Sequence, residues 1–155
     1  MKIVIGSDHG GYELKNKLVT FLEKNKYDAT DMGTHSKDSC DYPLIGFEVA
    51  KAVSVKKADR GVLICRTGIG MAIIANKVPG IRAGVCYSVE MAKSSREHND
   101  CNILVLAADY TEAALAEKIL KVWLDTESLG DRHARRVKQI TDIESKLRNR
   151  QNGKS

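Results

Sequence analysis

The chain has 155 residues, of which 43% are hydrophobic and 29% are charged, a composition typical of one globular domain. A domain of this length buries about 70% of the surface that its unfolded chain exposes, so it can fold without disulfides or metals. The chain contains two prolines and no low-complexity tract, which argues against disorder and linkers. We expect a single domain over residues 1–148 and a flexible tail over residues 149–155.

The formal net charge is +5, which permits an anionic partner. The basic residues are scattered among acidic ones and no stripe of aromatic and basic residues accompanies them, so nucleic acid is not the expected partner. The main basic cluster, residues 132–138 (RHARRVK), is too short for a duplex but suits one phosphate. A small anionic molecule is therefore the favoured partner.

The cysteines form neither a CxxC pair nor a set with histidines at metal-ligand spacing. We expect no metal site and reduced thiols, which are typical of the cytoplasm. The first apolar run, residues 3–5, is far shorter than the core of a signal peptide, and no stretch approaches membrane-spanning length. These features predict a cytoplasmic protein with no membrane partner.

Short apolar runs alternate with longer stretches of helical period, the pattern of a parallel sheet covered by helices on both faces. In chain order we expect a strand at 2–7, a helix at 11–25, a strand at 27–33, a helix at 41–54, a strand at 60–65, a helix after the loop at 65–70, a strand at 80–87, a helix at 88–98, a strand at 102–108, and helices at 111–125 and 132–148. The predicted fold is α/β, a Rossmann-like three-layer sandwich with a five-stranded parallel sheet.

Ligands of such sheets bind beyond the carboxyl ends of the strands. Residues 7–11 (SDHGG) follow the first predicted strand, residues 65–70 (CRTGIG) follow the third, and residues 97–100 (EHND) precede the fifth. We expect these three segments to face one crevice.

The loop at 66–70 (RTGIG) has neither the dinucleotide-binding spacing nor the Walker A spacing. Its backbone N–H groups could hold a phosphate or an oxyanion at a helix N-terminus, and a plain strand-to-helix turn is the alternative. Cys65 adjoins this loop, where the thiolate form is favoured, so it could act as a base or a nucleophile. The alternative is that Cys65 is simply a buried apolar residue.

Two histidines, His9 and His98, come at predicted strand ends, where an imidazole could move a proton near neutral pH. Surface or capping roles are the alternatives. Arg132 and Arg136 are four residues apart in a predicted helix, so they share a face and could bind one phosphate, unless they form only a solvated basic helix start. His133 is expected to point elsewhere.

Five segments, SDHGG, DYP, CRTGIGMAIIANKVPGIRA, SREHNDCN and GDRHARRV, resemble in order and spacing the family of ribose-5-phosphate isomerase type B and galactose-6-phosphate isomerase. The resemblance extends from residue 3 to about residue 143 and is more similar to the ribose-5-phosphate branch. It implies an isomerase domain that interconverts ribose 5-phosphate and ribulose 5-phosphate, in the pentose phosphate pathway, through an enediolate. It implies neither a metal nor an organic cofactor.

The resemblance also implies a role for each matched residue. Cys65 matches the proton-abstracting base, and His98 matches the group that opens the sugar ring, with Thr67 and Asp8 nearby. The remaining matches are the amides from Thr67 through Gly68 and Ile69 to Gly70 for the enediolate oxygens, His9, Arg132 and Arg136 for phosphate, and Tyr42 and Asn99 for sugar hydroxyls. Members of the family are homodimers or dimers of dimers with shared active sites, so residues 97–100 would reach the partner's Cys65.

Three positions depart from the family's pattern. Arg66 stands where glycine is usual, Asp109 where an arginine follows a strand-ending glycine, and Asp131 where a glycine precedes Arg132. We count Arg66 among the substrate-binding candidates and hypothesise that it supplies, or pairs with, a charge altered by Asp109 of the facing chain.

Two other functions stay open. The chain could isomerise another sugar phosphate, such as allose 6-phosphate, galactose 6-phosphate or a tetrose phosphate. It could also be a non-catalytic sugar-phosphate-binding protein in which Arg66 blocks the loop.

Overall fold

The computed structural model describes residues 1–153. Its centre is a five-stranded sheet in the order β2-β1-β3-β5-β4, and every neighbouring pair is parallel. The strands are β1 (Lys2–Ser7), β2 (Asp28–Asp31), β3 (Arg60–Cys65), β4 (Ala83–Val85) and β5 (Ile103–Ala107). The predicted α/β fold with a five-stranded parallel sheet is confirmed.

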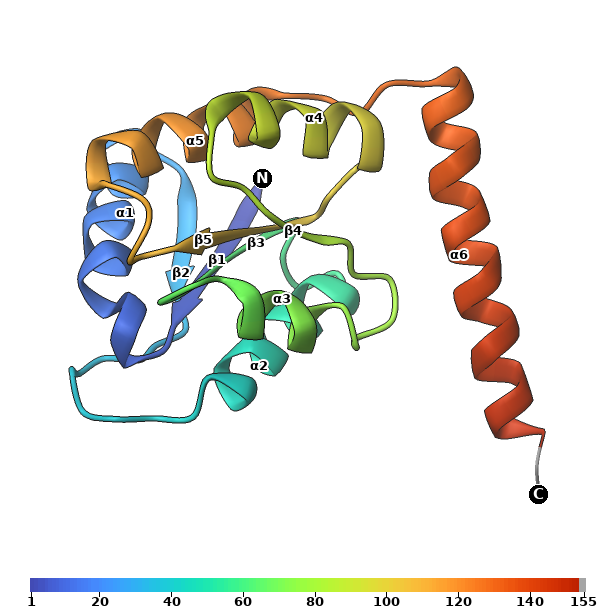
Figure 1. Cartoon of the computed structure of the whole chain (residues 1–155), viewed down its shortest axis with the longest axis horizontal. Helices are drawn as coiled ribbons and strands as arrows, with labels where there is room; N and C mark the ends of the chain where they lie inside the picture. The colour runs from blue at the N-terminus through green and yellow to red at the C-terminus, as the bar shows by residue number, and fades with distance from the viewer. Residues whose placement is uncertain (154–155) are drawn as a thin grey trace.

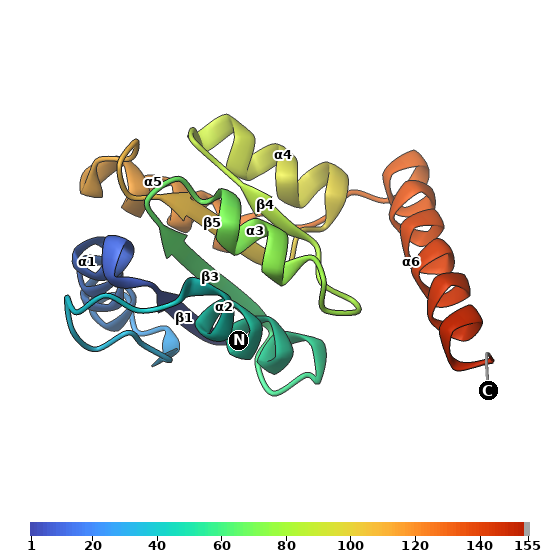
Figure 2. The same ribbon diagram turned by 60° about the horizontal axis from the view of Figure 1, so that its bottom comes forward.

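Helices cover both faces of the sheet (Figures 1 and 2). One face carries α1, α4 and α5, and the other carries α2 and α3. The helices are α1 (Tyr12–Lys24), α2 (Tyr42–Ser54), α3 (Ile69–Ala75), α4 (Val89–Asn99), α5 (Ala113–Asp125) and α6 (Asp131–Asn152), and a 3-10 turn, η1 (His9–Gly11), precedes α1.

The two central strands divide their side chains between two cores. Val62 and Ile64 of β3 pack under α1 and α5, whereas Leu63 and Cys65 pack under α2 and α3. Successive side chains of a strand point to opposite faces, so a strand buried on both faces must be apolar throughout. This explains the unbroken apolar runs of β3 and β5, and it places Cys65 on the face of α2 and α3.

Most predicted elements differ from the observed ones by one or two residues, but two strands, β2 and β4, are shorter than predicted. β4 begins only at Ala83 because the preceding backbone is occupied by other partners: the Asn102 side chain accepts from the Arg82 N–H at 2.8 Å and donates to the Gly80 carbonyl at 2.8 Å. β4 is also an edge strand that pairs with β5 alone, so its ladder is supported on one side only.

The last helix, α6, stands beside the rest of the molecule (Figure 1). Its contacts are made mainly with α4, and Glu144 accepts the Gly80 N–H at 2.9 Å. The helix continues to Asn152, so residues 149–152 of the predicted tail are helical, and residues 154–155 lie outside the described residues. No helix within residues 1–153 is long and apolar enough to cross a membrane.

Candidate active site

Cys65 is the last residue of β3, and its thiol is held by the loop that follows. The Gly68 N–H donates to Cys65 Sγ at 3.2 Å, and the residue is 6% exposed. Gly68 has a φ of +77°, and a Cβ there would lie 3.1 Å from Val85 Cγ1. Glycine is therefore needed both for the left-handed turn and for the close approach of the loop to β4. The contact fixes the sulfur against the backbone of the loop, within reach of a ligand bound there.

Thr67 is held from two sides. Its Oγ1 accepts the Ile69 N–H at 3.3 Å, and its carbonyl accepts the hydroxyl of Tyr87 at 3.2 Å. Tyr87 in turn packs edge-on against Tyr110, with ring centroids 6.5 Å apart. Tyr87 is not among the residues predicted from the sequence, and its place at the end of the fourth predicted strand is the one local feature that points to it.

Tyr42, the first residue of α2, reaches the same loop. A Cβ at Gly70 would lie 2.7 Å from Tyr42 Cζ, so the phenol ring rests on the glycine. The residue as a whole is 38% exposed. The structure therefore brings Tyr42 to Gly70.

Asp8 and His9 follow β1 at the same edge of the sheet. The Asp8 carboxylate accepts the Gly11 N–H at 3.0 Å and caps η1, while the Asp8 N–H donates to the carbonyl of Ile64 in β3 at 3.3 Å. His9 Nδ1 accepts the Cys40 N–H at 3.3 Å, which leaves the proton of a neutral imidazole on Nε2. Two of the three predicted segments, 7–11 and 65–70, thus share the carboxyl edge of the sheet.

Arg66 pairs with Asp109 of its own chain. The two side chains approach within 3.6 Å, Nη1 to Oδ2. β3 and β5 are neighbours and extend these two residues side by side beyond the sheet, so the charge of Asp109 already meets Arg66 within one chain.

The third segment, 97–100, does not share this edge. His98 and Asn99 lie at the end of α4, just before β5 begins at Ile103, and Ile103 pairs with Gly61 at the start of β3. Cys65 pairs with the other end of β5, which lies about 13 Å further along the strand. The prediction of one crevice within one chain is wrong, since α4 returns the chain to the amino edge of the sheet.

A second cluster forms at that far edge. His98 stacks on His133 of α6 with centroids 4.4 Å apart and planes 10° apart, and Arg132 Nε lies 3.4 Å from His133 Nε2. Desolvation, followed by the charges of His98, Arg132 and Arg136, lowers the pKa of His133. His133, which was expected to point elsewhere, belongs to this cluster.

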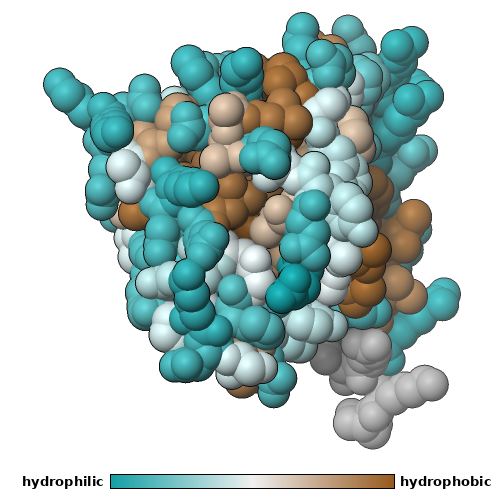
Figure 3. Space-filling view, turned by 60° about the vertical axis from the view of Figure 1, so that its left-hand side comes forward, coloured by the Kyte–Doolittle hydropathy of each residue, from teal (hydrophilic) through white to brown (hydrophobic). Residues whose placement is uncertain are grey.

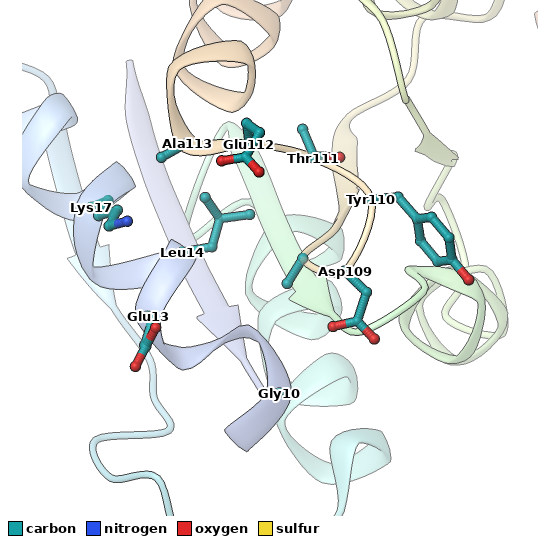
Figure 4. Close-up of a pocket in the computed structure, with 10 residues that line it drawn as sticks. Gly10, Glu13, Leu14, Lys17, Asp109, Tyr110, Thr111, Glu112 and Ala113 are labelled. Atoms are coloured by element: carbon teal, nitrogen blue, oxygen red, sulfur yellow. The ribbon is translucent and has the colours of Figure 1, made fainter.

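The carboxyl edge also carries a pocket of about 410 Å³ between α1 and the loop after β5 (Figure 4). Figure 3 looks at the side of the molecule toward which the strands point, where hydrophobic side chains lie in hollows between hydrophilic ones.

Within the described residues, no group of three or more His, Cys, Asp or Glu side chains has the arrangement of a metal site.

The chain matches a family model described as Ribose/Galactose Isomerase over residues 3–140. It is 42% identical to the ribose-5-phosphate isomerase B of Escherichia coli (strain K12), over 94% of this chain and 97% of that protein. The solved structure of Clostridium thermocellum ribose-5-phosphate isomerase B aligns with a TM-score of 0.93 and 53% identity, covering 95% of this chain and 99% of that one. A Mycoplasma genitalium ribose-5-phosphate isomerase B with bound ribulose-5-phosphate aligns with a TM-score of 0.90 and 34% identity, over 93% and 96% of the two chains.

These matches cover nearly the whole chain and confirm the resemblance carried by its five motif segments. The chain belongs to the ribose/galactose isomerase family.

Proposed function

We propose that this chain interconverts ribose 5-phosphate and ribulose 5-phosphate by proton transfer through an enediolate, without a cofactor. The observation that carries the proposal is the Gly68 N–H aimed at Cys65 Sγ at the carboxyl edge of the sheet. The names of the ribose-5-phosphate isomerase B relatives, one of them solved with ribulose-5-phosphate, support this substrate.

In the proposed reaction, the Cys65 thiolate removes the proton from C2 of the open-chain aldose. The electrons of the C–H bond form a C1–C2 double bond, and the former carbonyl oxygen takes the negative charge. N–H groups between Thr67 and Gly70 stabilise this oxygen, and one well-placed donor is worth about 3 kcal/mol. The same proton is returned at C1, and the proton of O2 passes to O1, so that O2 becomes the ketose carbonyl and O1 becomes a hydroxyl.

The active site is shared between two copies of the chain in this proposal. Cys65 and the His98 cluster lie at opposite edges of the sheet, so one chain cannot use both on one small sugar. A second copy would supply the missing cluster, and α6 has apolar side chains exposed for such a contact: Ile140 is 50%, Ile143 58% and Leu147 55% exposed. A homodimer, alone or within a dimer of dimers, is the assembly we propose.

Within the shared site, His98 with Asn99 opens the sugar ring and orients its hydroxyls, and Asp8 assists. The phosphate is bound by His9 of one chain and by Arg132 and Arg136 of the other. Tyr42 contacts the sugar hydroxyls beside the loop.

The enzyme acts as a single isomerase domain over residues 1–148. We place it in the cytoplasm and in the pentose phosphate pathway, consistent with four cysteines that form no disulfide. Neither a nucleic acid nor a membrane has a part in this function.

The test is a direct isomerase assay that follows ketose formation from ribose 5-phosphate. We expect turnover by the natural chain and a loss of about 100-fold or more in kcat for Cys65→Ala, because a positioned base contributes at least that factor. A rate unchanged in Cys65→Ala would contradict the base assignment. Ligand-induced thermal stabilisation without turnover would favour the binding-protein alternative.

The substrate itself is tested by comparing kcat/KM for ribose 5-phosphate, allose 6-phosphate, galactose 6-phosphate and a tetrose phosphate. We expect the highest value for ribose 5-phosphate. A higher value for another member of the panel would keep the mechanism and replace the substrate.

A further inference from the structure

Arg66 is a charged side chain that lies against the η1 turn at the carboxyl edge of the sheet. A Cβ added to Gly10 would lie 2.6 Å from Arg66 Cγ and 3.3 Å from Nε, so the stem of Arg66 rests on the η1 backbone next to His9. The side chain is still 65% exposed. The guanidinium is thus directed along the carboxyl edge while it remains accessible to a ligand.

Asp109 keeps the guanidinium in this place. The Asp109 N–H donates to the Arg66 carbonyl at 3.0 Å, which continues the pairing of β3 with β5 beyond the last strand residues. The ion pair itself is loose, at 3.6 Å, and the Asp109 side chain is 44% exposed. A guanidinium has five N–H donors, so a single loose carboxylate contact leaves most of them for an anion.

The surrounding charges decide where an anion can bind. Gly10 and Asp109 lie at one end of the pocket in Figure 4, whereas Glu112 and Lys17 lie at the opposite end. Glu112 and Lys17 bring opposite charges to that end, so it offers no net charge to attract a phosphate. The accessible N–H donors of Arg66, beside His9, are the favourable place for a dianion.

We infer that Arg66 is a specificity-determining residue of this site, whose guanidinium binds the phosphate of the sugar beside His9 while Asp109 acts as its positioning residue. This inference rests on the proposed function. Because the pair carries no net charge, it attracts a ligand through direct contact with the planar N–H fork. A sugar without a phosphate gains nothing from that contact, so the pair selects phosphorylated substrates.

The kinetic test uses Arg66→Gly in the full chain. The change removes the guanidinium and leaves the Asp109 carboxylate unbalanced beside the phosphate. We expect KM for ribose 5-phosphate to rise about 10-fold, with kcat changed by less than about 3-fold, as for a lost charged hydrogen bond in a partly exposed site. Arg66→Lys keeps the charge but not the fork, and we expect an increase in KM of about 3-fold.

A matched control breaks another ion pair of similar exposure. Lys121 and Asp125 pair at 2.6 Å near the end of α5, with side chains 58% and 51% exposed. Neither residue belongs to the catalytic or binding residues named above, so we expect Lys121→Ala to leave KM and kcat unchanged. If Arg66→Gly also leaves KM unchanged, the inference is overturned.

The role of Asp109 is tested by a double-mutant cycle. In an Asp109→Asn background, the same Arg66→Gly change should raise KM by only about 3-fold, because a guanidinium that Asp109 no longer holds contributes less to phosphate binding. Equal factors in the two backgrounds would overturn the positioning role of Asp109.

A binding measurement separates failure of this inference from failure of the proposed function. If the natural chain does not turn over ribose 5-phosphate, the proposed function fails, and calorimetry with inorganic phosphate still tests Arg66. We expect Kd for phosphate to be about 10-fold weaker in Arg66→Gly, and an equal Kd would overturn the inference. Arg66→Gln, which keeps the stem over Gly10, replaces Arg66→Gly if that variant does not fold.

Discussion

Gly68 is the residue whose replacement tests the loop geometry most directly. In Gly68→Ala the new side chain must adopt a φ of +77°, and the left-handed region costs an L-residue about 1–2 kcal/mol. Its Cβ would also lie 3.1 Å from Val85 Cγ1 and 3.4 Å from Val105 Cγ1. Valine has a stiff χ1, so relief requires backbone movement, at about 1–3 kcal/mol for overpacking. We expect a total loss of about 2–5 kcal/mol in the free energy of unfolding.

Gly80 provides a matched control. Its φ is +78°, but a Cβ there would meet nothing within 4 Å. Gly80→Ala therefore carries the conformational cost alone, about 1–2 kcal/mol. The difference between the two variants isolates the packing of the loop against β4 and β5.

The assay is urea unfolding followed by circular dichroism, at one protein concentration because assembly contributes to apparent stability. Gly68→Ala should also lower kcat by about 10-fold or more, since movement of the loop takes the N–H away from Cys65 Sγ, whereas Gly80→Ala should keep kcat. Equal losses of stability in the two variants, or full activity in Gly68→Ala, would refute the reasoning.

Three further predictions concern other side chains. Tyr87→Phe removes the hydrogen bond to the Thr67 carbonyl, so it should destabilise the fold by about 1 kcal/mol and lower kcat. An unchanged kcat would show that the hydroxyl does not position the loop. The pKa of His133 is lowered in the folded chain, so the unfolded chain binds more protons at this residue. The contribution of His133 to stability should therefore be lost as the pH falls through the ordinary histidine range. An NMR titration that places the pKa of His133 at or above that range would contradict this prediction. Desolvation by burial raises the pKa of Cys101 to about 11, so alkylation of the folded chain at pH 8 should modify the more exposed Cys40 and spare Cys101, as mass spectrometry of the peptides would show.

The local pattern of the sequence predicts the fold and the position of Cys65 and its loop. An unbroken apolar strand ending in Cys65, followed by a glycine-containing loop, predicts both burial on two faces and a turn at the carboxyl edge. The structure adds the contacts that make glycine necessary at Gly68 and Gly70, against Val85 and the ring of Tyr42. Those contacts join residues far apart along the chain, so periodicity and spacing carry no signal for them.

The sequence by itself determined the α/β class and the strand and helix order, because these follow from the period of apolar residues and from local backbone preferences. Tertiary structure decided which candidates meet. It separated His98 from Cys65 by the length of β5, stacked His98 on His133, and paired Arg66 with Asp109 within one chain. The physical reason is that the direction of each returning helix and the neighbours of each strand are properties of the packed sheet, and no single segment of the chain contains them.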